Sequence, residues 1–172
     1  MIPFFVAFGM VNALWAQLVA LAIFVIASLT DLLDGKIARA RGLVTNFGKF
    51  IDPIADKLLV MSALVLLVEQ GRMPGWVCIV MLAREFAISG FRLVAAGSGT
   101  VIAAAWLGKV KTVTQMTAVI MLLLLTPAGD YAPLLGNFGV ILANIATYAA
   151  AVMTIWSGAD YIIKNFDCIK DM

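Results

Sequence analysis

The chain has 172 residues, of which 63% are hydrophobic and only 13% are charged. Soluble domains are about 45–50% apolar and about 25% charged, so this composition excludes an ordinary soluble globular protein. No Asp, Glu, Lys or Arg occurs in residues 1–30, 112–129 or 131–159. A bilayer core of about 30 Å needs about 20 apolar residues in a helix, and these stretches supply them. The sequence therefore predicts an integral membrane protein.

Turn-forming residues divide the chain into six predicted helices. Helices are the expected structure because backbone polar groups in lipid must be satisfied within the chain. We expect an all-α protein with one domain over residues 1–172 and six transmembrane helices, of which the first is short. Their predicted ranges are residues 2–14, 15–36, 47–68, 76–96, 112–126 and 138–162.

The basic residues predict the orientation of these helices. Eleven of the twelve fall at the chain end or near the links after the second and fourth helices, and only Arg72 lies in a turn on the opposite side. Basic residues are enriched on the cytoplasmic side of membrane proteins. We therefore expect both termini and these two links to lie in the cytoplasm.

The absence of histidine restricts the chemistry that the chain can perform. It excludes a histidine base, a Ser-His-Asp triad and a histidine-ligated zinc or haem site. Cys78 and Cys168 are isolated from each other and predict neither a disulfide framework nor a CxxC metal site. A general base must therefore be a carboxylate or a lysine.

Four aspartates occur where the second predicted helix ends and the third begins. Asp31 and Asp34 are three residues apart, and Asp52 and Asp56 are four apart, so each pair lies on one helix face. The short link makes the two helices antiparallel neighbours, which places both pairs near the cytoplasmic surface. Clustered carboxylates at that depth are costly, and four oxygen donors suit a hard cation such as Mg²⁺ or Mn²⁺. The alternative is a set of interfacial charges that extend to water.

Glycine and arginine beside these aspartates indicate a phosphate ligand. Gly35 and Gly48 flank the link and lack a Cβ atom, which permits close approach of a ligand, although Gly48 could also be a packing glycine. Arg39 lies next to the acidic face, where a metal-bound diphosphate would present its oxygens. Together these residues predict a phosphoryl-transfer site in which Asp56 is placed to act as the base.

The spacing of these residues resembles the signature of the CDP-alcohol phosphotransferase family. Eight positions match at every spacing: Asp31, Asp34, Gly35, Ala38, Arg39, Gly48, Asp52 and Asp56. The resemblance extends from residue 2 to about residue 163. It implies a homodimer with six transmembrane helices per subunit, in the plasma membrane of a bacterium, with the active site open to the cytoplasmic leaflet. Family members usually begin with a short polar segment before the first helix, whereas this sequence begins directly with apolar residues.

The resemblance also implies roles for the matching residues. The family's metal-binding aspartates, for Mg²⁺ or Mn²⁺, correspond to Asp31, Asp34, Asp52 and Asp56, and Asp56 matches its general base. Its cytidine and diphosphate contacts correspond to Asp31, Gly35, Ala38 and Arg39, and we place Gly48 with them. The implied reaction joins CDP-diacylglycerol and sn-glycerol 3-phosphate and releases CMP.

An acceptor phosphate would need cations of its own. Arg84 and Arg92 occur in the fourth predicted helix, and Lys109 and Lys111 in the link that follows it. We expect these four side chains to bind the acceptor phosphate beside the aspartates. Contact with lipid headgroups would also explain the two lysines, and an ion pair with Glu85 would explain the arginines.

Other functions remain open at this point. The same chemistry could serve another acceptor, such as serine, inositol phosphate or a phospholipid. A prenyltransferase would need two Asp-rich motifs on a longer chain, whereas this sequence has one such motif. A divalent-cation transporter would place its site near the membrane midplane, often between repeats, whereas these aspartates are predicted near one membrane surface. We expect CDP-diacylglycerol, glycerol 3-phosphate, membrane lipids and a second subunit as partners, and no nucleic acid.

Overall fold

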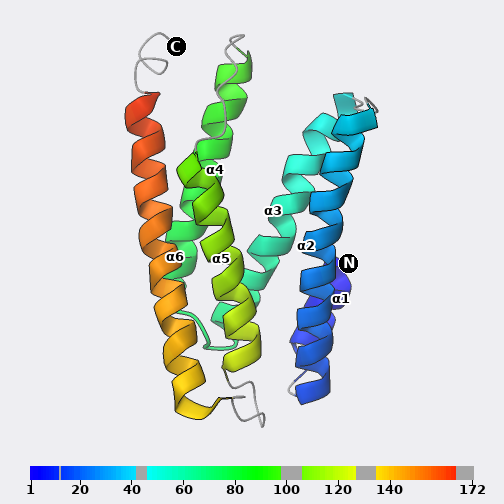
Figure 1. Ribbon diagram of the computed structural model, residues 1–172, viewed down its shortest axis with the longest axis vertical. Helices are drawn as coiled ribbons and strands as arrows, with labels where there is room; N and C mark the ends of the chain where they lie inside the picture. The colour runs from blue at the N-terminus through cyan, green and yellow to red at the C-terminus, as the bar shows by residue number, and fades with distance from the viewer. Residues whose placement is uncertain (12, 42–45, 98–105, 127–134, 166–172) are drawn as a thin grey trace.

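The computed structural model describes residues 1–11, 13–41, 46–97, 106–126 and 135–165, and within helices the side chains of residues 31–41, 46–56 and 96–97 are outside this description. The described residues form six helices and confirm the predicted all-helical fold (Figure 1). The helices are α1 (Ile2–Gly9), α2 (Leu14–Arg41), α3 (Asn46–Glu69), α4 (Gly75–Gly97), α5 (Trp106–Leu125) and α6 (Gly136–Lys164).

Three helix boundaries differ from the sequence prediction by five residues or more. α1 ends at Gly9 instead of residue 14, α2 ends at Arg41 instead of residue 36, and α5 begins at Trp106 instead of residue 112. Lys109 and Lys111 therefore lie on a helix, and their predicted position in a link is wrong. The prediction started the helix after its last charge, but Lys111 is buried, with 1% of its surface exposed, and pairs with Glu85 of α4. A charge that has such a partner does not end an apolar helix.

The outer surface of the helices is apolar. Large side chains with mostly exposed surface include Phe4, Ile79, Phe86, Ile145 and Ile163. Among the described residues, α5 and α6 are long and apolar enough to cross a membrane, and residues 14–30 of α2 form a shorter apolar helix. Extensive exposed apolar surface marks contact with lipid or another protein. With the composition, these features indicate a membrane protein.

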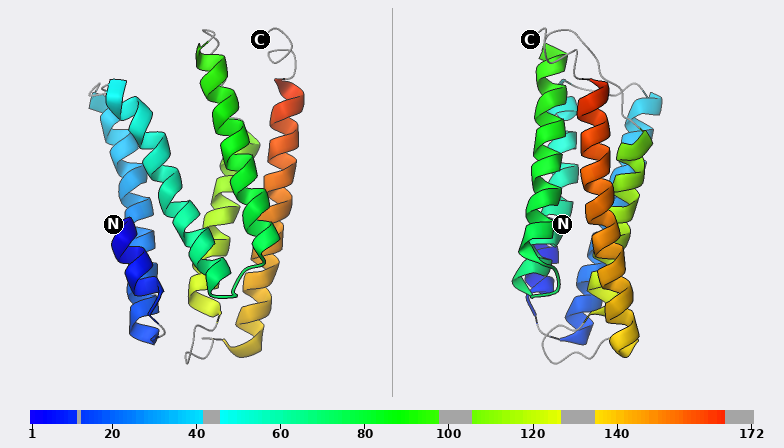
Figure 2. Two further views of the ribbon diagram at one scale, coloured as in Figure 1. Left: turned by 180° about the vertical axis from the view of Figure 1, so that it is seen from behind. Right: turned by 90° about the vertical axis from the view of Figure 1, so that its left-hand side faces the viewer.

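The helices form two groups that diverge toward one end of the molecule. α1, α2 and α3 make up one group, and α4, α5 and α6 the other (Figure 1). α5 and α6 share the most extensive contact, and α5 also packs on α2 and α3. The carboxyl ends of α2, α4 and α6 and the amino end of α3 all lie at the upper end in Figure 1. From behind, α3 separates from α4 toward this upper end (Figure 2).

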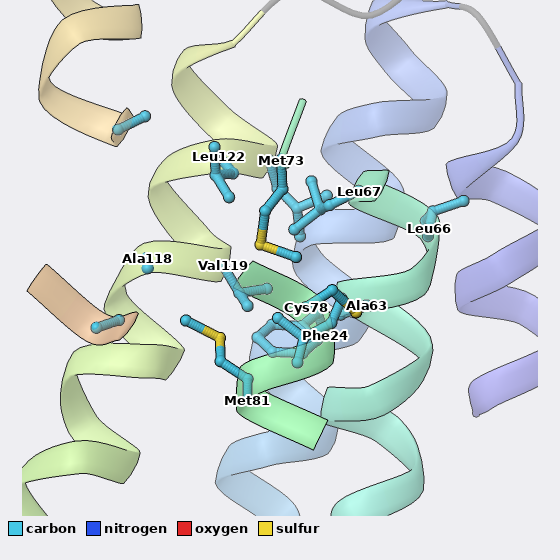
Figure 3. Packing of buried hydrophobic residues seen from close by; sticks show 14 of the residues in the cluster. Phe24, Ala63, Leu66, Leu67, Met73, Cys78, Met81, Ala118, Val119 and Leu122 are labelled. Carbon is cyan, nitrogen blue, oxygen red and sulfur yellow. The ribbon is translucent and has the colours of Figure 1, made fainter. Parts of the chain in front are cut away.

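The hydrophobic core joins the two groups below this divergence. Phe24 of α2, Leu67 of α3, Met81 of α4, and Val119 and Leu122 of α5 are buried in one cluster. Their side chains converge in the close-up view (Figure 3). The core therefore fixes α3, α4 and α5 relative to one another in the lower half of the molecule. This packing also sets how the upper parts of the three helices face one another.

Arg72, in the turn between α3 and α4, connects several segments at the lower end. Gly71 has a φ of +68°, the left-handed conformation that commonly ends a helix, and the amide of Arg72 then donates to the carbonyl of Leu67. The Arg72 side chain is 7% exposed. Its Nε donates to Thr126 Oγ1 at 2.7 Å, and its Nη1 donates to Gln17 Oε1 and Gln70 Oε1 at 3.0 Å each.

The two glutamines extend this network to α1. Gln17 Nε2 donates to the carbonyl of Gly9 at 2.8 Å, and Gln70 Nε2 donates to the same oxygen at 2.6 Å. One guanidinium therefore links the end of α1, the start of α2, the end of α3 and the end of α5. This network explains why α1 stops at Gly9, whose carbonyl is used by side chains.

We expect Arg72→Met to lower the free energy of unfolding by about 2–4 kcal/mol, because it leaves several buried oxygens without their donor. The thermal unfolding midpoint of the detergent-solubilised protein measures this loss. Lys164→Met is the matched control, since it removes an equal charge from an exposed ion pair with Asp160. Equal midpoints for the two variants would contradict the structural role of Arg72.

Candidate functional site

A cavity of about 250 Å³ lies between α3, α4 and α5, above the hydrophobic core. Of the residues that the structure describes, five cationic side chains, one carboxylate and three uncharged polar side chains line it. We call it the cationic pocket, and its polar lining residues are Lys57, Arg84, Glu85, Ser89, Arg92, Lys109, Lys111, Thr112 and Gln115. The structure thus brings together the four cations that we selected from the sequence for an acceptor phosphate.

Helical spacing places these side chains on one face of each helix. On α4, Glu85, Ser89 and Arg92 are separated by four and three residues, and on α5, Lys111 and Gln115 are separated by four. The cationic side chains of the two helices therefore face the same cavity, although long stretches of chain separate them. The remaining lining is apolar, with Val60, Met61 and Leu64 on α3 and the other residues on α4 and α5.

Glu85 is the carboxylate that holds the cations together. Lys111 Nζ donates to Glu85 Oε1, and Arg84 Nη1 donates to the same oxygen at 3.2 Å. The ion pair with Glu85 that the sequence suggested for the arginines is therefore formed by Arg84. The other cation that pairs with Glu85 is Lys111. Among the described lining residues, five cations face this one carboxylate, and such an excess of positive charge favours an anionic ligand.

Arg92 is oriented by α6. Its Nε donates to the hydroxyl of Tyr161 at 3.2 Å, and its guanidinium carbon lies 5.3 Å from the centre of the Tyr161 ring. Tyr161 is 2% exposed and packs edge-on against Phe91. This hydrogen bond uses Nε and so leaves the two terminal nitrogens of Arg92 available. They can make the paired contact that arginine forms with phosphate oxygens.

Lys57 connects α3 to this face of α4. Its Nζ donates to Ser89 Oγ, and the Ser89 hydroxyl donates to the carbonyl of Glu85 at 2.6 Å. Lys57 directly follows Asp56, the predicted base. The cationic pocket therefore reaches the helical turn of α3 that contains Asp56.

Two buried nitrogen atoms at the pocket have no hydrogen-bond partner among the described residues. They are Arg84 Nε and Gln115 Nε2. Arg84 passes close to α6, because a Cβ atom at Gly158 would lie 3.2 Å from Arg84 Cγ. A buried donor without an acceptor costs about 1–3 kcal/mol, so the pocket retains unused capacity to bind a ligand with several oxygen atoms.

The predicted metal and nucleotide residues lie near the upper ends of α2 and α3. α2 contains Asp31, Asp34, Gly35, Ala38 and Arg39 near its carboxyl end, and α3 contains Gly48, Asp52 and Asp56 near its amino end. α2 and α3 pack against each other, and these ends lie side by side at the upper end (Figures 1 and 2). The side chains of these eight residues lie outside the described part of the structure, so their roles stay predictions.

Sequence reasoning missed several residues of the pocket. Gln115 lies one helical turn after Lys111, and Lys57 follows Asp56, so both had a local signal in their spacing. Ser89 follows Glu85 by one helical turn, so it also had a local signal. Tyr161 had no signal, because its contact with Arg92 joins two helices that are remote in the sequence.

Comparison with known proteins gives consistent matches over most of the chain. A family model described as CDP-alcohol phosphatidyltransferase matches residues 1–156. The CDP-diacylglycerol–glycerol-3-phosphate 3-phosphatidyltransferase of Bacillus subtilis is 47% identical over 155 residues, which cover 90% of this chain and 77% of that protein.

Two further relatives have similar names. The protein of the same name from Salmonella typhimurium is 40% identical over 168 residues, covering 94% of this chain and 86% of that protein. A probable phosphatidylglycerophosphate synthase of Mycobacterium tuberculosis is 41% identical over 149 residues, covering 87% of this chain and 66% of that protein. The family match covers the spaced aspartates and the cationic pocket alike, which confirms the resemblance found in the sequence. The chain belongs to the CDP-alcohol phosphatidyltransferase family and is a transferase.

Proposed function

We propose that the protein transfers the phosphatidyl group of CDP-diacylglycerol to sn-glycerol 3-phosphate, giving phosphatidylglycerophosphate and CMP. The observation that carries this proposal is the cationic pocket, which gathers Arg84, Arg92, Lys109 and Lys111 next to the turn of α3 that contains Asp56. The names of the relatives from Bacillus subtilis and Salmonella typhimurium describe the same reaction.

The charge and size of the pocket favour a small phosphorylated acceptor. An excess of cations suits a phosphate group, which serine lacks. The cavity of about 250 Å³ is below the range of about 300–1,000 Å³ that is usual for drug-sized ligands, which disfavours a second phospholipid as the acceptor. Glycerol 3-phosphate satisfies both conditions, and inositol phosphate satisfies the charge condition.

The donor site of the proposal is the pair of helix ends that carry the aspartates. Asp31, Asp34, Asp52 and Asp56 would hold Mg²⁺ or Mn²⁺, and this set of four carboxylates fits the preference of these ions for oxygen ligands. The bound metal would supply electrostatic stabilisation of charge on the diphosphate. Gly35, Ala38, Arg39 and Gly48 would hold the nucleotide and its diphosphate beside it.

In the proposed reaction, Asp56 accepts the proton from the primary hydroxyl of glycerol 3-phosphate. The hydroxyl oxygen forms a bond to the phosphorus of the phosphatidyl group, while the bond from that phosphorus to the CMP oxygen breaks and CMP leaves with the electron pair. Arg84 and Arg92 hold the acceptor phosphate, which fixes the position of the hydroxyl at the other end of a three-carbon molecule. Fixing two reactants in this way converts a bimolecular step into an effectively unimolecular one.

The proposal includes a membrane topology and an assembly. We place α2 to α6 across the bacterial plasma membrane, with the upper end in the cytoplasm, whereas the eight residues of α1 are too few to cross it. The distribution of basic residues supports this orientation, since Lys109, Lys111 and Lys164 belong to the upper half and Arg72 to the lower end. A homodimer is proposed from the family resemblance.

We expect purified protein to release CMP from CDP-diacylglycerol only when glycerol 3-phosphate is present, and Asp56→Asn to lower the rate by about 10²–10⁴-fold because the base is lost. Asp160→Asn is the control, since Asp160 pairs with the exposed Lys164 on α6. CMP release that requires serine or inositol phosphate would reject the acceptor. No release with any acceptor from folded, Mg²⁺-supplied protein would reject the reaction.

Removal of divalent metal by EDTA should abolish CMP release, and added Mg²⁺ or Mn²⁺ should restore it. Asp34→Asn should raise the Mg²⁺ concentration that gives half-maximal activity, because it removes a charged oxygen ligand. The same titration on Asp160→Asn checks that a remote carboxylate has no such effect. Full activity in EDTA would contradict the metal site.

We expect Arg92→Met to raise the KM for glycerol 3-phosphate by about 10–100-fold, because charge-assisted hydrogen bonds to the phosphate contribute about 1.5–3 kcal/mol. The KM for CDP-diacylglycerol should stay the same. Arg92→Lys keeps the charge without the paired geometry, so its KM should fall between those of Arg92→Met and wild type. Lys164→Met is the control for loss of one exposed positive charge. A change confined to the CDP-diacylglycerol KM would assign Arg92 to the donor instead.

A further inference from the structure

Gln115 of α5 is a buried polar residue whose amide nitrogen has no use within the described protein. The residue is 3% exposed, lines the cationic pocket, and follows Lys111 by one helical turn. Its Nε2 has no hydrogen-bond partner among the described residues. Since buried polar groups are nearly always paired, this donor calls for a specific explanation.

Other buried polar side chains show how this fold normally satisfies such groups. Thr126, Thr147 and Thr154 each donate to a backbone carbonyl one turn earlier. Gln17, the other buried glutamine among the described residues, donates to Gly9 and accepts from Arg72. Gln115 differs from all of these, because it lines the cavity that the cations also line. Its unpaired donor therefore indicates a hydrogen-bond partner outside the described protein, such as a ligand in that cavity.

The chemistry of an amide identifies which part of the ligand it contacts. Phosphate oxygens have better partners in the pocket, since Arg84, Arg92 and Lys111 are charged donors. A hydroxyl group both donates and accepts a hydrogen bond, as does a glutamine amide, so the two match without charge. Rotation of the terminal amide costs little, which lets either end meet the hydroxyl.

The acceptor has two hydroxyl groups, and the position of Gln115 separates them. The reacting primary hydroxyl must reach Asp56 on α3, whereas Gln115 lies on α5, on a different wall of the pocket. We propose that Gln115 hydrogen-bonds the secondary hydroxyl of glycerol 3-phosphate and thereby selects this acceptor over phosphorylated alcohols that lack it. This inference rests on the proposed function, and it makes Gln115 a specificity-determining residue that takes no part in proton transfer.

The test compares two acceptors in wild type and in Gln115→Met. The second acceptor is 3-hydroxypropyl phosphate, which keeps the phosphate and the primary hydroxyl but lacks the secondary hydroxyl. We expect wild type to prefer glycerol 3-phosphate by about 10–100-fold in kcat/KM, since an unpaired buried group costs about 1–3 kcal/mol. In Gln115→Met the ratio should fall to near one, through a higher KM for glycerol 3-phosphate. The KM for CDP-diacylglycerol should not change.

The matched control is Thr117→Val, an exposed position two residues further along α5, which should keep the wild-type preference. Thermal unfolding separates a specificity role from a structural one. Because the Gln115 amide nitrogen has no partner among the described residues, Gln115→Met should unfold no earlier than wild type, whereas Gln17→Met should unfold earlier because its amide is bonded on both sides.

Each outcome has a definite meaning. Equal use of the two acceptors by wild type, or an unchanged preference in Gln115→Met, would overturn the role of Gln115 and leave the proposed reaction intact. A loss of stability like that of Gln17→Met would make Gln115 a structural residue and would also overturn the inference. Absence of CMP release with glycerol 3-phosphate in wild type would instead reject the proposed function itself.

Discussion

The pocket depends on the interaction between Lys111 and Glu85. Lys111 is buried among helices whose other side chains are largely apolar, and an unpaired charge there would be strongly unfavourable. The carboxylate of Glu85 makes the position tolerable, and it also contacts Arg84. As a result α5 continues as a helix through Lys109 and Lys111, and its first turns form one wall of the pocket. Loss of Glu85 would leave several like charges facing one another across α4 and α5.

The molecule separates the interactions that hold the fold from those that bind ligand. At the lower end, Arg72 is surrounded by hydrogen-bond acceptors from the protein, and the hydrophobic core lies next to it. In the upper half, Arg84 and Gln115 retain buried nitrogens with no partner among the described residues. A membrane protein has few buried polar side chains, so each of them calls for an explanation in terms of structure or ligand binding. The hydrogen bonds of Arg72 stabilise the helix arrangement, and the unpaired nitrogens of Arg84 and Gln115 lie at the site that we propose.

The sequence predicted the helices and four of the five pocket cations because both leave local patterns in the sequence. Charge-free stretches indicate where helices lie. Arg84 and Arg92 belong to the same helix however that helix packs against its neighbours. The start of α5 was wrong, because sequence reasoning treats charges as the end of an apolar helix, and the partner of Lys111 lies on another helix. The Tyr161–Arg92 contact was missed for the same reason. Contacts between helices depend on how the helices pack, and no local pattern records that.

Charge alone cannot make the pocket selective. Five cationic side chains attract any small phosphate compound that reaches the pocket, because electrostatic attraction depends little on what the phosphate is attached to. Selection among phosphorylated alcohols must therefore come from the uncharged walls. Val60, Met61 and Leu64 of α3 limit the size of the acceptor, and they offer nothing to a hydroxyl group. Gln115, an uncharged polar residue on the wall formed by α5, is suited to this selection. Its hydrogen bond to a hydroxyl group would depend on the position of one oxygen atom.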